Sequence, residues 1–158
     1  MDVIELIIKN LSLSIDKYEG ASMAVPGGTS PIKIFDELSK QKLDWSKVQI
    51  TLVDDRLVDT DNEHSNQKLI RNYLLKNEAQ ISNFIPLNKN LYKDNNFKFP
   101  LDICLLGIGN DGHFASLFPN MINNTNTLDP KSKININGIK ANGDPFLPRI
   151  SMNLPLIL

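Results

Sequence analysis

The sequence is poor in the residues that mark several large classes of protein. Its 158 residues contain one cysteine, Cys104, which excludes an internal disulfide framework and is typical of a reducing, cytoplasmic compartment. No apolar run approaches the ~20 residues that cross a bilayer. The apolar N-terminus carries Asp2 and Glu5, which a secretory signal avoids. A net charge of −1 lacks the basic excess of nucleic-acid-binding proteins. We expect a cytoplasmic protein that binds neither membrane nor nucleic acid.

Histidine and arginine are also scarce. The two histidines, His64 and His113, lie far apart in the sequence, and with one cysteine they do not supply a zinc-ligand cluster, so we expect no metal and no cofactor. Three of the 17 basic residues are arginines: Arg56, Arg71 and Arg149. A chain that uses lysine for surface charge can keep arginine where a planar, bidentate fork is needed. Codon bias is the alternative explanation for any one of them.

Strands and helices alternate along the chain. Short, continuous apolar strands separated by amphipathic helices are typical of a parallel sheet with helices on both faces. We therefore expect an α/β fold: an open, mostly parallel, doubly wound sheet of the Rossmann-like type, in a single domain over residues 1–158. The predicted helices cover 2–18, the segment after Pro31, and 64–76; the predicted strands cover 21–25, 49–55, 102–109, a short stretch near 134–139, and a strand that begins at 149.

In such sheets, ligands bind beyond the carboxyl ends of the strands. The first candidate segment there is Gly27-Gly28-Thr29-Ser30-Pro31. Its glycines let the backbone approach a ligand, Ser30 suits the N-cap, and Pro31 suits the first helical position. A phosphate would then face the helix N-terminus. The alternative is a tight turn with ordinary capping.

The second segment, Asp54-Asp55-Arg56, follows a predicted buried strand. The arginine could clamp a phosphate, and an aspartate could orient a water or a sugar hydroxyl. The alternative is a solvated acidic turn.

The third segment, from Gly107 to His113, ends another predicted strand. A histidine is a natural general base near neutral pH, and Asp111, two residues before His113, can fix its tautomer. The glycine-rich position at the ligand-binding edge favours catalysis over a structural histidine. Which of Asp54, Asp55 and Asp111 partners His113 stays open.

Together these segments resemble the 6-phosphogluconolactonase family, within the wider group that includes glucosamine-6-phosphate isomerases. The resemblance covers nearly the whole chain, and the match around the histidine is long and specific. Asp55 stands in place of the family's glutamate, Thr29 and Ser30 are in swapped order, and Asn120 replaces a glycine. The matching segments are Gly27-Gly28-Thr29-Ser30-Pro31, then Asp54-Asp55-Arg56 with Ser65-Asn66, then Leu106 to Asn120, and Pro148-Arg149-Ile150-Ser151-Met152.

The resemblance implies hydrolysis of 6-phospho-D-glucono-1,5-lactone to 6-phospho-D-gluconate, in the oxidative pentose phosphate pathway, without a metal. His113 would activate the water, with Asp111 and Asp54 as further catalytic residues. The partner implied is a sugar phosphate, and a homodimer is a further expectation. The residues implied to bind substrate or phosphate are Gly27, Gly28, Thr29, Ser30, Asp55, Arg56, Gly109, Asn110 and Arg149.

Two alternatives remain at this stage. A glucosamine-6-phosphate isomerase/deaminase would carry Asp-Glu-Tyr in the second segment and a glutamate soon after the histidine, whereas this chain has Arg56 and no glutamate between Ser116 and Pro119. The second alternative is a shortened, non-catalytic protein that binds a sugar phosphate. The family is longer than this chain, so the resemblance implies a missing first strand and a missing C-terminal part, including another strand, a phosphate-binding lysine and closing helices.

Overall fold

The computed structural model describes residues 2–93 and 97–158, and a parallel sheet lies at its centre. The order of its four strands is β4-β2-β1-β5, with all neighbours parallel. β1 and β2 pair along their full length, from Ala21 opposite Val48 to Val25 opposite Leu52. This sheet confirms the predicted α/β class. The strands are β1 (Ala21–Val25), β2 (Val48–Leu52), β4 (Asn83–Phe84) and β5 (Ile103–Cys104).

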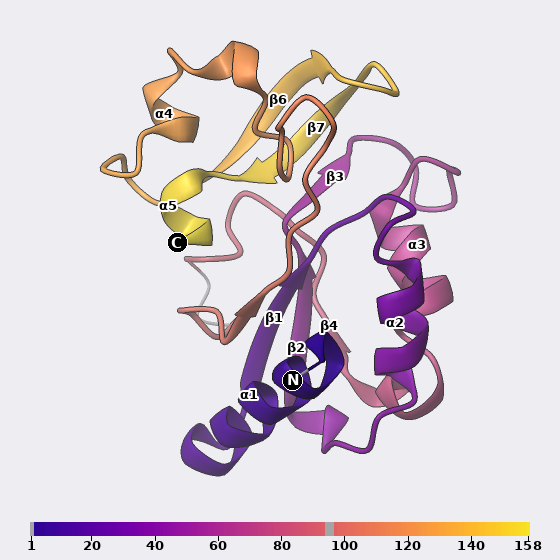
Figure 1. Cartoon of the computed structure of the whole chain (residues 1–158). Coiled ribbons are helices and arrows are strands. Elements are labelled where there is room, and N and C mark those ends of the chain that lie inside the picture. The colour runs from indigo at the N-terminus through magenta and orange to yellow at the C-terminus, as the bar shows by residue number, and fades with distance from the viewer. Residues whose placement is uncertain (1, 94–96) are drawn as a thin grey trace.

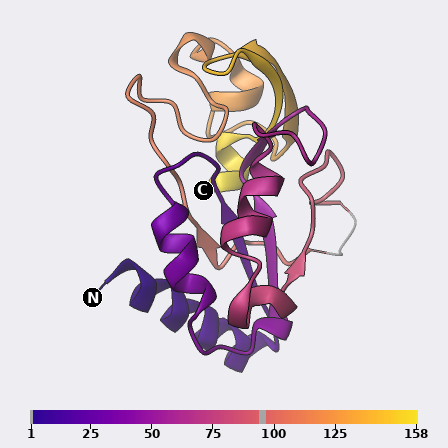
Figure 2. The same cartoon turned by 90° about the vertical axis from the view of Figure 1, so that its right-hand side faces the viewer.

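Three helices pack together on one face of this sheet: α1 (Val3–Tyr18), α2 (Ile32–Ser39) and α3 (Asn66–Tyr73). Figure 2 shows α2 and α3 side by side, with α1 crossing below them. Their apolar stripes and alternate residues of β1 form one buried cluster, which also takes in Trp45. The 3-10 helices η1 (Trp45–Lys47) and η2 (Asn77–Ile81) complete this side.

A second, antiparallel sheet lies beyond the carboxyl ends of β1 and β2 (Figure 1). Its strand order is β3-β7-β6: β3 (Asp54–Arg56), β7 (Leu147–Met152) and β6 (Ile136–Asn142). This sheet and the short helix α5 (Leu154–Ile157) bury a second apolar cluster with Ala24 of β1. A short helix therefore also lies on the second face. The remaining short elements are η3 (Pro119–Met121) and α4 (Thr125–Leu128).

Several predicted strands have different bounds in the structure. The expected strand 49–55 is split at Val53: its N–H donates to the carbonyl of Val25, while its carbonyl accepts from the N–H of Met152, so the chain passes from one sheet to the other there. The expected strand 102–109 pairs only over Ile103–Cys104, because the glycine-rich segment leaves the sheet. The strand predicted from 149 ends at Met152 and continues into α5.

Within the described ranges, none of the helices has the length and apolar character needed to cross a membrane.

Candidate active site

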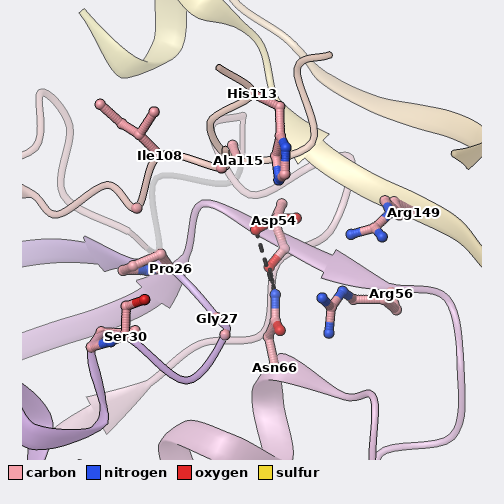
Figure 3. Close-up of a pocket in the computed structure, with 14 residues that line it drawn as sticks. Pro26, Gly27, Ser30, Asp54, Arg56, Asn66, Ile108, His113, Ala115 and Arg149 are labelled. Carbon is pink, nitrogen blue, oxygen red and sulfur yellow. Dashed lines mark hydrogen bonds between the residues drawn. The ribbon is translucent and has the colours of Figure 1, made fainter. Parts of the chain in front are cut away.

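The three sequence segments meet at one cleft of about 250 Å³, where the parallel sheet ends and the second sheet begins. Figure 3 shows His113 directed toward Asp54, with Arg149 and Arg56 one above the other beside them. The prediction that these distant segments share one edge of the sheet therefore agrees with the geometry. The lining residues are Pro26, Gly27, Gly28, Ser30, Pro31, Asp54, Arg56, Asn66, Gly107, Ile108, Gly109, His113, Ala115 and Arg149.

The loop after β1 supplies one wall through close backbone approach. A Cβ on Gly27 would lie 1.8 Å from Oδ1 of Asn66, so only glycine lets this loop pack against the start of α3. Gly28 has φ of +82°, a conformation that favours glycine.

The N-terminus of α2 differs from the expectation. The helix begins at Ile32, Pro31 occupies the N-cap, and no side-chain cap bond occurs there within the described chain. The N–H of Ile32 instead donates to the carbonyl of Thr29 at 3.3 Å, closing a turn that leaves Ser30 on the cleft. The prediction that Ser30 is the N-cap of this helix was therefore wrong. Ser30 does line the cleft, which agrees with its predicted place in the site. Thr29 is not among the lining residues.

Asp54 is the buried carboxyl of the cleft, 5% exposed. The Ser116 hydroxyl donates to its Oδ2 at 2.5 Å, and Nδ2 of Asn66 donates to its backbone carbonyl at 2.9 Å. Burial raises the pKa of Asp54, because the charged form loses its hydration; the Ser116 hydrogen bond and the nearby arginines act in the opposite direction. Asp54 is thus held in one orientation at the centre of the site.

Asp55 has a different position from the one expected of a substrate ligand. Its Oδ1 accepts from the N–H groups of Arg56 and Asn66, at 2.8 and 2.7 Å, and its Oδ2 accepts from that of Gln67 at 3.1 Å. The carboxylate therefore satisfies free N–H groups at the start of α3. It is not among the residues that line the cleft. Burial raises the pKa of Asp55 despite these three bonds.

Arg56 and Arg149 lie directly opposite each other in the β3–β7 pair. Nη1 of Arg56 donates to the carbonyl of His64 at 2.8 Å, but its buried Nε finds no hydrogen-bond partner among the described residues. Arg149 is 3% exposed and donates to the carbonyls of Asn142 and Pro145, at 3.1 and 2.9 Å. Burial and the neighbouring Arg56 lower the pKa of Arg149. Like charges opposite each other destabilise a sheet, and an anion between them would offset that cost.

The loop from Gly109 to His113 holds the histidine against a carboxylate. Nδ1 of His113 lies 2.5 Å from Oδ1 of Asp111, which also accepts the N–H of His113 at 3.2 Å. These contacts lower the pKa of Asp111, so the carboxylate is ionised and acts as the acceptor. The proton of a neutral imidazole therefore belongs on Nδ1, which leaves Nε2 as the free base. Asp111 contacts the histidine directly, while Asn110 is not a lining residue.

Gly109 and Gly112 make this loop geometry accessible. A Cβ on Gly109 would lie 2.3 Å from Cε1 of His113, so any other residue would displace the ring. The N–H of Gly109 donates to the carbonyl of His113 at 2.8 Å, and Gly112 turns the chain with φ of +87°.

Sequence reasoning assigned no role to two polar residues that hold Asp54. Asn66 was noted only as part of the Ser65-Asn66 pair, and Ser116 carried no local signal because its partner, Asp54, lies 62 residues earlier. The structure brings both onto the same carboxyl.

The fold and the cleft define an α/β protein with a polar cleft at the carboxyl edge of a parallel sheet. The family model described as glucosamine-6-phosphate isomerases/6-phosphogluconolactonase matches residues 1–158, and the chain belongs to this family.

Similar proteins carry the name 6-phosphogluconolactonase. One from Neisseria meningitidis is 44% identical over 119 residues, which cover 67% of this chain and 51% of that protein. One from Helicobacter pylori is 35% identical, over 96% of this chain and 69% of that protein. The crystal structure of a 6-phosphogluconolactonase from Shewanella baltica has a TM-score of 0.81 and 32% identity, over 98% of this chain and 70% of that one. The chain thus spans about half the length of the Neisseria protein, and about 70% of the length of the Helicobacter and Shewanella proteins.

Proposed function

We propose that the chain hydrolyses 6-phospho-D-glucono-1,5-lactone to 6-phospho-D-gluconate, with His113 as the general base. The observation that carries this proposal is the contact of Asp111 with His113, a histidine that lines the same cleft as Arg56 and Arg149. Supporting evidence comes from proteins named 6-phosphogluconolactonase that are similar to this chain in sequence and in structure.

His113 acts on a water molecule placed next to the lactone carbonyl. Nε2 takes one proton from the water as its oxygen attacks the carbonyl carbon, and Asp111 stabilises the imidazolium that forms. The tetrahedral intermediate then collapses, the bond from the carbonyl carbon to the ring oxygen breaks, and His113 returns the proton to that oxygen. The products are the open-chain acid and a regenerated base.

Arg56 and Arg149 bind the phosphate of the substrate. The partnerless Nε of Arg56 and the low exposure of Arg149 make both guanidiniums suited to an oxyanion. Ser30 and the loop at Gly27 and Gly28 supply further polar contact. Binding at the phosphate, remote from the reacting carbonyl, holds the labile lactone beside the base.

The deaminase alternative has less support. Ring-opening chemistry of an amino sugar would use a glutamate near the histidine, and no glutamate lines the cleft within the described part of the chain.

The test is lactonase activity on freshly generated 6-phosphogluconolactone, above the spontaneous rate. His113→Ala should lower kcat by about 10²–10⁴-fold, the contribution of a general base. His64→Ala is the matched control, because the hydrogen bond from Arg56 goes to the backbone carbonyl of His64, which alanine keeps. Release of ammonia from glucosamine 6-phosphate would overturn the assignment. Binding of 6-phosphogluconate without any rate enhancement would indicate the non-catalytic alternative.

A further inference from the structure

One aromatic side chain, Phe118, contacts both the base and an arginine of the cleft, and it is itself buried at 3% exposure. The His113 ring stacks on it, with centroids 4.7 Å apart and planes 29° from parallel. The guanidinium of Arg149 lies over the same ring, with its Cζ 5.5 Å from the centroid. The contacts of a cation and of an imidazole with an aromatic face are both attractive.

The backbone around Phe118 leaves the ring little freedom. Gly143 has φ of +68°, and a Cβ there would lie 2.7 Å from Cε1 of Phe118 and 3.3 Å from Nη2 of Arg149. The Arg149 guanidinium also donates to the carbonyls of Asn142 and Pro145, on either side of Gly143. The turn, the arginine and the ring therefore form one packed unit.

We propose that Phe118 is a positioning residue that couples His113 to Arg149, so that an anion bound at Arg149 fixes the orientation of the base. This inference rests on the proposed function for its catalytic readout. The phosphate of the substrate then contributes to kcat as well as to KM, because binding energy remote from the carbonyl is used to orient the catalytic group. Substrates without a phosphate are turned over slowly for that reason, in addition to binding weakly.

Phe118→Leu tests the coupling, because leucine keeps an apolar side chain but removes the ring. With 6-phosphogluconolactone its kcat should fall by about tenfold to a hundredfold, the effect of misplacing a catalytic group by about 1 Å. The ratio of kcat between 6-phosphogluconolactone and glucono-1,5-lactone should shrink toward one. Phe35→Leu is the matched control, because Phe35 is fully buried in the cluster beneath the helices, away from the cleft. Its stability should fall while its kcat ratio stays at the wild-type value.

A second readout does not need any turnover. Inorganic phosphate is titrated into the protein while the imidazole NMR signals of His113 are followed. We expect phosphate to shift these signals in the wild type and in Phe35→Leu, and the shift to be lost in Phe118→Leu although phosphate still binds by calorimetry. If the lactone is not hydrolysed but this pattern holds, the proposed function fails and the coupling stands. The coupling would be overturned if Phe118→Leu showed the same phosphate-induced shift of the His113 signals as wild type, and the same ratio of kcat between the two lactones.

Discussion

Two glycines in the segment between β5 and His113 differ in what a methyl group would meet. A Cβ on Gly109 would collide with the His113 ring, whereas a Cβ on Gly107 meets no described atom within 4 Å. Gly109→Ala should displace the imidazole and lower kcat by about a hundredfold, the cost of misplacing a catalytic group by about 1 Å. Gly107→Ala should lower kcat much less than Gly109→Ala, since its Cβ meets no described atom and the imidazole stays in place. Steady-state kinetics of both variants checks this, and equal losses would show that the loop tolerates no side chain at either position.

The buried carboxyl of Asp54 gives the protein a pH-dependent cost. Its pKa in the folded state lies above the reference value of 3.8, so the unfolded chain releases this proton first as pH rises. Stability from this group is therefore greatest below pH 3.8 and is lost as pH rises through the folded pKa. Asp54→Asn removes the ionisation and keeps an oxygen for the Ser116 hydroxyl.

We therefore expect the free energy of unfolding of Asp54→Asn, relative to wild type, to increase from pH 4 to pH 7, while kcat/KM falls. Urea denaturation at several pH values measures the first effect, and the lactonase assay measures the second. Asp59→Asn is the control for removing a surface carboxylate from the same segment. If the difference in free energy of unfolding between Asp54→Asn and wild type stays constant from pH 4 to pH 7, the raised pKa of Asp54 is contradicted.

At the residue scale, the spacing of the sequence predicts a side-chain contact of the site only where the two partners are close in the chain. Asp111 and His113 are two positions apart, so their contact follows from sequence alone, and the glycines between strand and histidine mark a close approach. Ser116 and Phe118 depend on Asp54 and Arg149, whose positions are set by pairing of β3 with β7. The same pairing places Asp55 at the start of α3, which no spacing rule indicates.

At the scale of the element, α3 depends on two capping groups from different parts of the chain. The Ser65 hydroxyl accepts the N–H of Lys68 at 3.2 Å, and Asp55 accepts those of Asn66 and Gln67. The helix thereby holds Asn66 against Asp54 and Gly27. The stability of α3 and the shape of the cleft are therefore linked.

Ser65→Ala should lower the free energy of unfolding by about 1 kcal/mol, the usual cost of losing an N-cap side chain. Urea denaturation monitored by circular dichroism measures it. Ser12→Ala within α1 is the matched control and should be neutral or slightly stabilising, because alanine has the highest helix propensity. If Ser65→Ala behaves like the control, Asp55 alone is sufficient to cap α3.

Among the elements, the helices α1, α2 and α3 and the paired strands β1 and β2 were predictable because their apolar patterns are regular, whereas the short helices α4 and α5 were not predicted. The boundary between β2 and β3 was not, since the run from Ile50 to Arg56 is broken at Val53, a residue of high β-propensity, and contains neither glycine nor proline. Its division depends on backbone partners of Val53 in two different sheets. The end of β6 was not predictable either, because its pairing with β7 extends the strand to Asn142.

At the scale of the whole molecule, two apolar clusters share the central strand. Met23 and Val25 of β1 face the cluster under the helices, and Ala24 faces the cluster beneath the second sheet. Val53 then joins the two sheets through its hydrogen bonds to Val25 and Met152. This continuity favours a single cooperative unfolding transition, in which loss of packing in either cluster destabilises both.

The single tryptophan allows a direct test, because Trp45 lies in the cluster under the helices. Met152→Ala removes a fully buried side chain from the other cluster and should lower the free energy of unfolding by about 2–5 kcal/mol. The Trp45 fluorescence transition in urea should move with the circular dichroism transition, by the same amount. Met23→Ala, in the tryptophan's own cluster, is the matched variant. Movement of the fluorescence transition in Met23→Ala but not in Met152→Ala would mean that the second sheet, with Arg56 and Arg149, unfolds independently of the parallel sheet.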